Sequence, residues 1–154
     1  MSFGGGRSLA SPQFPDDQGL VDPTLDRSDE TTLLATLGGA RVFVPVVAVL
    51  GEVATDGSDK NSEMAAVLMT GADGRTALLA FTSIATMSAW NPTSRPVPVH
   101  GRDAARSALA EGASALLVDL GQPGFAVIET DDLRHLADGH VLVRTAAGTA
   151  WVSP

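Results

Sequence analysis

Apolar runs alternate with short polar stretches along most of the chain, and this pattern predicts strands interleaved with helices. The predicted strands are residues 41–50, 64–70, 76–81, 95–100, 114–120, 125–129, 141–144 and 149–152. The predicted helices are residues 28–37, 83–90, 102–110 and 131–138. The fold class that follows is α/β: a single domain with a mixed sheet, interleaved helices and two β-hairpins.

Turn residues define the two hairpins. Asp73-Gly74 lies between two apolar runs, which is typical of a hairpin turn, and residues 146–148 separate the last two strands in the same way. Pro45 lies inside the first predicted strand and has no N–H for a ladder hydrogen bond. That strand is therefore expected at a sheet edge or with a bulge.

The N-terminus and one internal loop lack an apolar pattern. Residues 1–21 contain three consecutive glycines and two prolines, so we expect a disordered tail followed by the domain at residues 22–154. Residues 52–63 are expected to form a mobile polar loop. Ser28 is expected to cap the first helix, Thr82 or Ser83 the second, and Thr130 the last.

Composition excludes several classes of partner. The net charge is −8, and only one of the ten basic residues is lysine. A chain this acidic repels the phosphate backbone of nucleic acids and anionic membrane surfaces, so we expect neither as a partner. Cysteine is absent, which removes thiolate metal sites and cysteine nucleophiles. With no secretory segment visible, the expected location is the cytoplasm.

The sequence contains no recognisable catalytic set. No Gly-x-Ser-x-Gly elbow is present, and no glycine-rich loop leads into a helix as phosphate binding requires. His135 and His140 are five residues apart with Gly139 between them, unlike the i, i+4 spacing of two ligands on one helical face. We therefore expect no catalytic residues, no metal and no cofactor.

Two groups of residues remain as candidate sites. Phe81 and Trp90 bracket a short helix, and with Thr82, Ser83 and Met87 they are expected to form an interaction patch if partly exposed. The alternative is a ligand pocket. Asp119 ends an apolar strand, where α/β proteins place binding groups, and Ser83 and His100 would complete that pocket.

Several ordered segments carry a family resemblance. They are NSEMA (61–65), GADGR (71–75), LAFTS (79–83), WNP (90–92), RPVPV (95–99), EGA (111–113) and LLVD (116–119). Over residues 28–139 the chain resembles the SseB N-terminal-domain family. Its alanine- and arginine-rich composition with little lysine is similar to that of actinobacterial members. The resemblance implies an α/β domain without an established enzymatic activity.

Two functional hypotheses follow. The first is a non-enzymatic interaction or regulatory module that binds an unidentified protein partner or a second copy of itself through the patch around Phe81 and Trp90. The second is a small-molecule-binding protein or enzyme with its site at strand ends near Ser83 and Asp119. The first requires exposed apolar surface beside Trp90, and the second requires its side chains to converge on one concave pocket.

Overall fold

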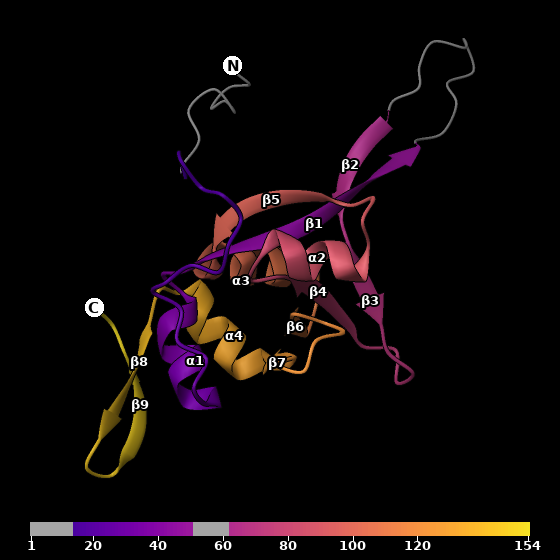
Figure 1. Ribbon diagram of the computed structural model, residues 1–154. Helices are drawn as coiled ribbons and strands as arrows, with labels where there is room; N and C mark the ends of the chain where they lie inside the picture. Colours follow the sequence, from indigo (N-terminus) through magenta and orange to yellow (C-terminus); the bar gives the residue numbers. More distant parts are fainter. Residues whose placement is uncertain (1–13, 51–61) are drawn as a thin grey trace.

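The computed structural model describes residues 14–50 and 62–154, which form an α/β domain (Figure 1). The helices are α1 (Glu30–Leu37), α2 (Ile84–Trp90), α3 (Gly101–Ala110) and α4 (Thr130–Ala137). The strands are β1 (Arg41–Leu50), β2 (Ser62–Ala66), β3 (Leu68–Thr70), β4 (Thr76–Ala80), β5 (Arg95–His100), β6 (Ala115–Val118), β7 (Ala126–Glu129), β8 (Val141–Thr145) and β9 (Gly148–Val152). The predicted fold class is confirmed.

The strands form two sheets and a separate hairpin. The first sheet has the order β2-β1-β5 and is antiparallel, and the second has the order β3-β4-β6-β7. In the second sheet β4 and β6 are parallel, while β3 and β7 run antiparallel to their neighbours. The Phe43 N–H donates to the Phe81 C=O at 2.7 Å, and the Phe81 N–H donates to the Phe43 C=O at 2.8 Å. These two bonds join the two sheets.

The parallel pair depends on a long crossover from β4 to β6 through α2, β5 and α3. Alanines 104, 105 and 108 of α3 are buried, so this helix packs closely on the sheet. Its first residue, Gly101, leaves no room for a side chain, because a Cβ there would lie 2.0 Å from the Leu37 carbonyl oxygen. Leu37, Leu78 and Leu116 are fully buried in the main core between these elements.

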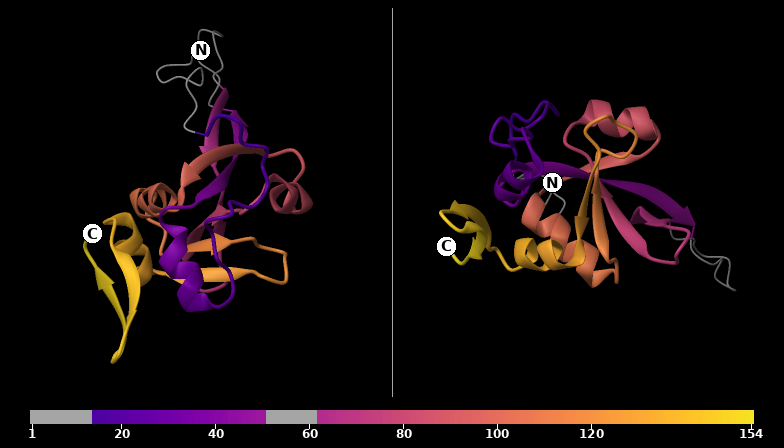
Figure 2. Two further views of the ribbon diagram at one scale, coloured as in Figure 1. Left: turned by 60° about the vertical axis from the view of Figure 1, so that its left-hand side comes forward. Right: turned by 90° about the horizontal axis from the view of Figure 1, so that it is seen from below.

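Both predicted hairpins form. Between β3 and β4 the Gly71 N–H donates to the Arg75 C=O at 2.8 Å, and Gly74 has the positive φ that this turn needs. The second hairpin, β8–β9, pairs with neither sheet. Figure 2 shows this hairpin standing out from one end of the domain and the paired ends of β1 and β2 from the other. Among the described residues, no helix has the length and apolar character that crossing a bilayer requires.

Three local predictions are wrong. Asp29, not Ser28, caps α1, with its carboxylate accepting from the Thr32 N–H at 2.8 Å. Thr130 does not cap α4, because its hydroxyl donates to the Ser114 C=O at 2.6 Å. Pro45 lies on a central strand and not at an edge. Proline is tolerated there because β1 changes partner at this point, from Phe81 to β2.

Part of the predicted tail is among the described residues. Residues 1–13, like 51–61 of the predicted loop, lie outside the described residues, and Ser62 and Glu63 belong to β2. Residues 14–23, here called the N-terminal strap, lie against the body of the domain. Asp17 forms an ion pair with Arg41, and Gly19 is buried beside Ile84. Local composition missed the strap because these contacts are to distant residues.

Candidate functional site

The first candidate feature lies where the parallel strands β4 and β6 end. Asp119 follows β6 directly, and its N–H donates to the Ala80 C=O at the end of β4 at 2.9 Å. Its φ is +60°, in the left-handed region that Asp and Asn tolerate better than most residues. Carboxyl ends of neighbouring parallel strands meet at one sheet edge, so Asp119 and Thr82 come together there.

The carboxylate of Asp119 is fully buried and fully bonded. It accepts from the Thr82 N–H at 2.8 Å, the Thr82 hydroxyl at 2.7 Å and the Thr86 hydroxyl at 3.0 Å. The Arg27 guanidinium lies 2.8 Å from its second oxygen. A carboxylate has about four lone-pair sites, and these four donors occupy them. We call this group the strand-end cluster: Asp119, Thr82, Thr86 and Arg27. Its bonds leave the Asp119 carboxylate no acceptor capacity for a substrate.

The Ser83 hydroxyl is also committed to the fold. It caps α2 by accepting from the Thr86 N–H at 3.1 Å, and Thr86 bonds back to complete a capping box. The next N–H of the helix, that of Ile84, donates to the Gly19 C=O of the N-terminal strap at 2.9 Å. Of the two predicted caps of this helix, Thr82 and Ser83, Ser83 is the residue that caps it, and this role explains why a serine stands there.

The second candidate feature is built on Arg41, which starts β1 and is only 4% exposed. Its guanidinium bonds the Asp17 carboxylate at 2.9 and 3.2 Å, the Thr82 C=O at 2.9 Å and the Leu20 C=O. It also lies 4.1 Å from the centre of the Phe43 ring. Arg41 thus ties the N-terminal strap to the strand-end cluster, with Thr82 as the shared residue.

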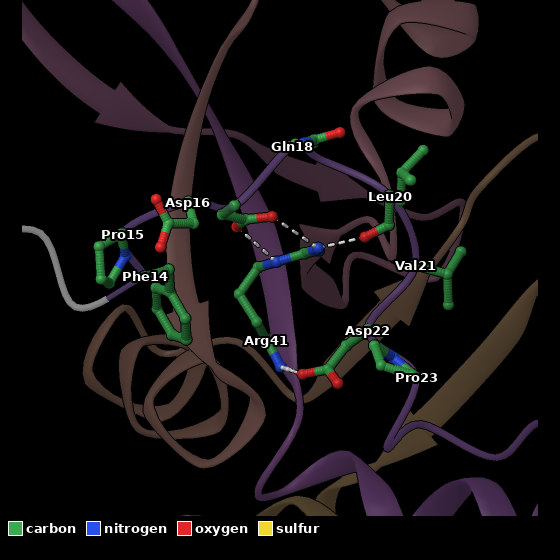
Figure 3. Close-up of a pocket in the computed structure, with 10 residues that line it drawn as sticks. Phe14, Pro15, Asp16, Gln18, Leu20, Val21, Asp22, Pro23 and Arg41 are labelled. Atoms are coloured by element: carbon green, nitrogen blue, oxygen red, sulfur yellow. Dashed lines mark hydrogen bonds and ion pairs between the residues drawn. The ribbon is translucent and has the colours of Figure 1, made fainter.

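A hollow of about 560 Å³ opens above Arg41, bounded by the N-terminal strap. Its rim is largely apolar, formed by Phe14, Pro15, Leu20, Val21 and Pro23. Leu20 is 70% exposed and Val21 43%. Figure 3 shows Phe14 and Pro15 on one side of Arg41 and Leu20 and Val21 on the other. Three carboxylates and one guanidinium also line the hollow, those of Asp16, Asp17, Asp22 and Arg41.

Asp22 holds the far end of the N-terminal strap. Its carboxylate accepts from the Arg41 N–H and the Thr24 N–H, each at 2.9 Å. Partial burial alone would raise the pKa of Asp22, but these hydrogen bonds and the nearby Arg41 charge outweigh it and hold the pKa below its usual value. Asp22 is therefore ionised in the folded protein at neutral pH.

Most of the predicted interaction patch lies inside the domain. Phe81, Thr82, Ser83 and Met87 are buried, so they support α2 from beneath and do not form its surface. Trp90 is half-buried, with its ring 5.5 Å from that of Phe81. Of the five residues, only Trp90 has substantial exposed surface. The large apolar side chain that α2 itself exposes is Ile84, which lies beside Gly19 of the N-terminal strap.

The residues of the predicted pocket are placed separately. Ser83 and Asp119 both bond Thr86, but His100 lies against the Phe14 ring and 4.0 Å from Asp103. Among the described residues, no hydrogen bond joins His100 to Ser83 or Asp119. The hollow above Arg41 is lined by none of the three.

The two histidines that sequence spacing separated are in contact. Their Nδ1 atoms are 2.9 Å apart, because Gly139 takes a positive φ and His140 folds back to bond the His135 carbonyl. His135 also stacks on Trp151, with ring centres 4.9 Å apart. In the part of the chain that the structure describes, no third histidine or carboxylate joins them in a group that could hold a metal.

Local sequence patterns do not predict the floor and rim of the hollow. Arg41 carries the one available signal, a charged residue opening an otherwise apolar valine-rich strand. Such a residue is either at the solvent-exposed start of the strand or buried with a partner. The partner, Asp17, lies in a segment whose composition predicts a tail.

The fold defines a small α/β domain with a parallel strand pair at its centre and a bonded carboxylate at the strand ends. Comparison with protein families makes the assignment specific. The SseB protein N-terminal domain model matches residues 22–135, so the chain belongs to this family and the predicted resemblance is confirmed. No curated protein and no solved structure matches the chain. Residues 14–21 of the N-terminal strap and the β8–β9 hairpin lie outside the matched range.

Proposed function

We propose that this protein is a non-enzymatic interaction module that binds a protein partner at the hollow above Arg41. The supporting observation is the contrast between rim and floor. Leu20 and Val21 expose large apolar side chains, while Arg41 is buried and its donors are engaged by the fold. Such a hollow suits an apolar side chain, since its burial against the rim releases water without breaking a polar contact.

The charge around the hollow specifies the partner further. Three aspartates face one arginine, which leaves a local charge of −2 within a chain of −8. A basic residue beside the docking apolar side chain would complement this charge. A second copy of the chain would bring like charges together, so we propose a different protein as the partner.

The alternative, an enzyme or small-molecule binder at the strand ends, receives less support. Its central carboxylate, Asp119, is fully buried and bonded by four donors. The Ser83 hydroxyl caps α2 and has no base beside it, and His100 lies against Phe14. Nucleophilic catalysis needs a nucleophile and a base within hydrogen-bond reach, and these residues do not provide that pair.

Photo-crosslinking tests the proposal in the native cell. A benzophenone amino acid at position 20 should crosslink one protein, and the same group at the exposed position 147, in the β8–β9 turn, should not. The partner is then purified and titrated calorimetrically. Leu20→Asp should weaken binding more than about tenfold, since burying a leucine contributes about 1.5–3 kcal/mol. Unchanged affinity, or the same products from both positions, would refute the hollow as the site.

Light scattering on the purified chain tests the self-association that remains the rival form of this proposal. A monomer at micromolar concentration agrees with a separate partner, whereas a dimer lost on Leu20→Asp would assign the hollow to a second copy. We also propose the cytoplasm as the place of action. We propose the actinobacterial branch of the family as the source, on the basis of a single lysine against nine arginines.

A further inference from the structure

The two sheets differ in how their outer edges are closed. Strand β5 is an edge strand of the first sheet and contains Pro96 and Pro98. The backbone N–H and C=O of Phe43 in β1 point to Phe81 and so away from β5. Those of Val42 and Val44 therefore point to β5, where these residues lie opposite Val99 and Val97. Pro96 and Pro98 alternate with Val97 and Val99 along β5, so the proline nitrogens point away from β1. The edge of β5 therefore lacks the donors that a further strand would need.

Strand β7 forms an edge of the second sheet without this protection. The Asp119 N–H donates to Ala80 of β4, so the Val118 C=O in the same peptide unit points the other way, to β7. Val118 pairs with Ala126, and Leu116 pairs with Ile128. Bonding direction alternates along a strand. The N–H and C=O of Val127 consequently point away from β6, where no described strand lies.

A groove runs beside this open edge. It has a volume of about 460 Å³ and is lined by β7, by the start of α1 and by the preceding turn. Leu33 and Phe125 give it apolar surface, and Phe125 is 42% exposed. An open backbone edge beside an apolar groove is the arrangement that binds an extended segment as an added strand.

Charge at the groove selects the kind of segment. Asp29, Glu30 and Glu129 line it against Arg27, whose guanidinium is held by Asp119 and the Gly124 C=O. Asp29 and Glu129 form ion pairs with arginines that are themselves largely exposed, and such pairs are readily exchanged for another cation. Among the described residues Glu30 is in no ion pair, so two copies pairing through β7 would bring two such carboxylates to one seam, which disfavours a second copy.

We propose that the outer edge of β7 binds an extended, basic segment of a partner protein as an additional antiparallel or parallel strand. The segment alternates apolar residues, which enter the groove beside Phe125, with lysine or arginine facing Glu30 and Glu129. This surface goes beyond the hollow above Arg41 and shares no lining residue with it.

The probe is a library of random dodecapeptides displayed on phage and selected on the full chain. We expect enrichment of peptides that alternate β-branched residues with lysine or arginine. The synthesised peptide should slow hydrogen exchange at the Val127 and Glu129 amides. Absence of any enriched peptide, or enrichment of acidic peptides, would overturn the proposal.

Two variants locate the binding. Val127→Pro removes the outward N–H of β7, as the two prolines do in β5. It should weaken peptide binding about tenfold, the effect of losing one well-made hydrogen bond. Val127→Thr, which keeps the N–H, should bind as the parent does. If the proline variant does not fold, Glu30→Lys serves instead and should weaken the peptide by charge repulsion. Unchanged affinity in a folded proline variant or in the Glu30 variant contradicts the proposal.

Leu20→Asp separates this proposal from the proposed function. It should leave the dodecapeptide affinity unchanged, because Leu20 lines only the hollow above Arg41. If Leu20→Asp abolishes binding and the Val127 amide is unaffected, the peptide occupies the hollow, and the β7 proposal fails while the proposed function stands. Loss of partner binding at Leu20 has no bearing on the dodecapeptide at β7.

Discussion

Replacing Asp119 by asparagine tests whether the strand-end cluster stabilises the fold. Asparagine has the same shape and tolerates φ near +60° at least as well, so the backbone need not move. The substitution removes the charge and turns one acceptor oxygen into a donor. That donor must face either the Thr82 N–H and Thr86 hydroxyl or Arg27 and the Thr82 hydroxyl.

The expected loss follows from burial. Breaking a buried ion pair by removing one partner costs about 3–5 kcal/mol. The Arg27 side chain is 29% exposed, so water can solvate part of its charge, and the threonine hydroxyls can rotate. We therefore expect Asp119→Asn to lower the free energy of unfolding by about 2–4 kcal/mol.

Urea unfolding at neutral pH, followed by circular dichroism and tryptophan fluorescence, measures this loss. Asp16→Asn is the matched control, because Asp16 also has a positive φ but is exposed. It should change stability by less than about 0.5 kcal/mol. If the two variants lose the same small amount, the four bonds to Asp119 do not stabilise the fold as the geometry indicates. A double-mutant cycle with Thr82→Val should show that the two losses are not additive.

Two further predictions concern the packing of α3 and the ionisation of Asp22. Gly101→Ala should destabilise the protein by about 2 kcal/mol or more, because the added Cβ meets the rigid Leu37 backbone. Gly74→Ala, with a positive φ but open space, should cost only about 1–2 kcal/mol, and equal losses in thermal unfolding would contradict the steric argument. The pKa of Asp22 is lowered in the folded state, so its stabilisation is present above the unfolded pKa, about 4, and is lost as pH falls through the folded value. The stability difference between the parent and Asp22→Asn should therefore be present at pH 7 and shrink toward pH 2, and a constant difference would contradict it.

Elements set by local sequence could be predicted. Ser83 caps α2 because its hydroxyl reaches an N–H three residues away, and Asp73-Gly74 turns the chain by its own backbone preferences. The strand at 95–100 was predicted with its observed bounds, since its two prolines exclude a helix. The predicted caps of α1 and α4 are each wrong by one residue. For α1, Ser28 and Asp29 are both residue types that cap helices, and only the hydrogen bond from the Thr32 N–H identifies Asp29 as the cap.

The candidate site could be predicted only in part. The position of Asp119 after a strand marks it as a candidate, but its partner Arg27 is far away in the sequence, and no local pattern predicts that they meet. Arg41 and Asp17 meet for the same reason, through the path of the strap across β1. The contact of His135 with His140 was missed because a helix C-cap brings together residues that helical periodicity keeps apart.

The hollow above Arg41 is assembled from two parts of the chain, one inside and one outside the range that matches the family. Arg41, Asp22 and Pro23 lie within the range that matches the family, while the rim from Phe14 to Val21 precedes it. Thr82 connects these parts, since its C=O bonds Arg41 and its N–H and hydroxyl bond Asp119. The range that matches the family therefore supplies the buried floor of the hollow, and the N-terminal strap supplies most of its exposed apolar rim. We accordingly expect replacement of the exposed Leu20 and Val21 side chains to weaken partner binding while leaving the ion pair of Asp17 with Arg41 and the strand-end cluster in place.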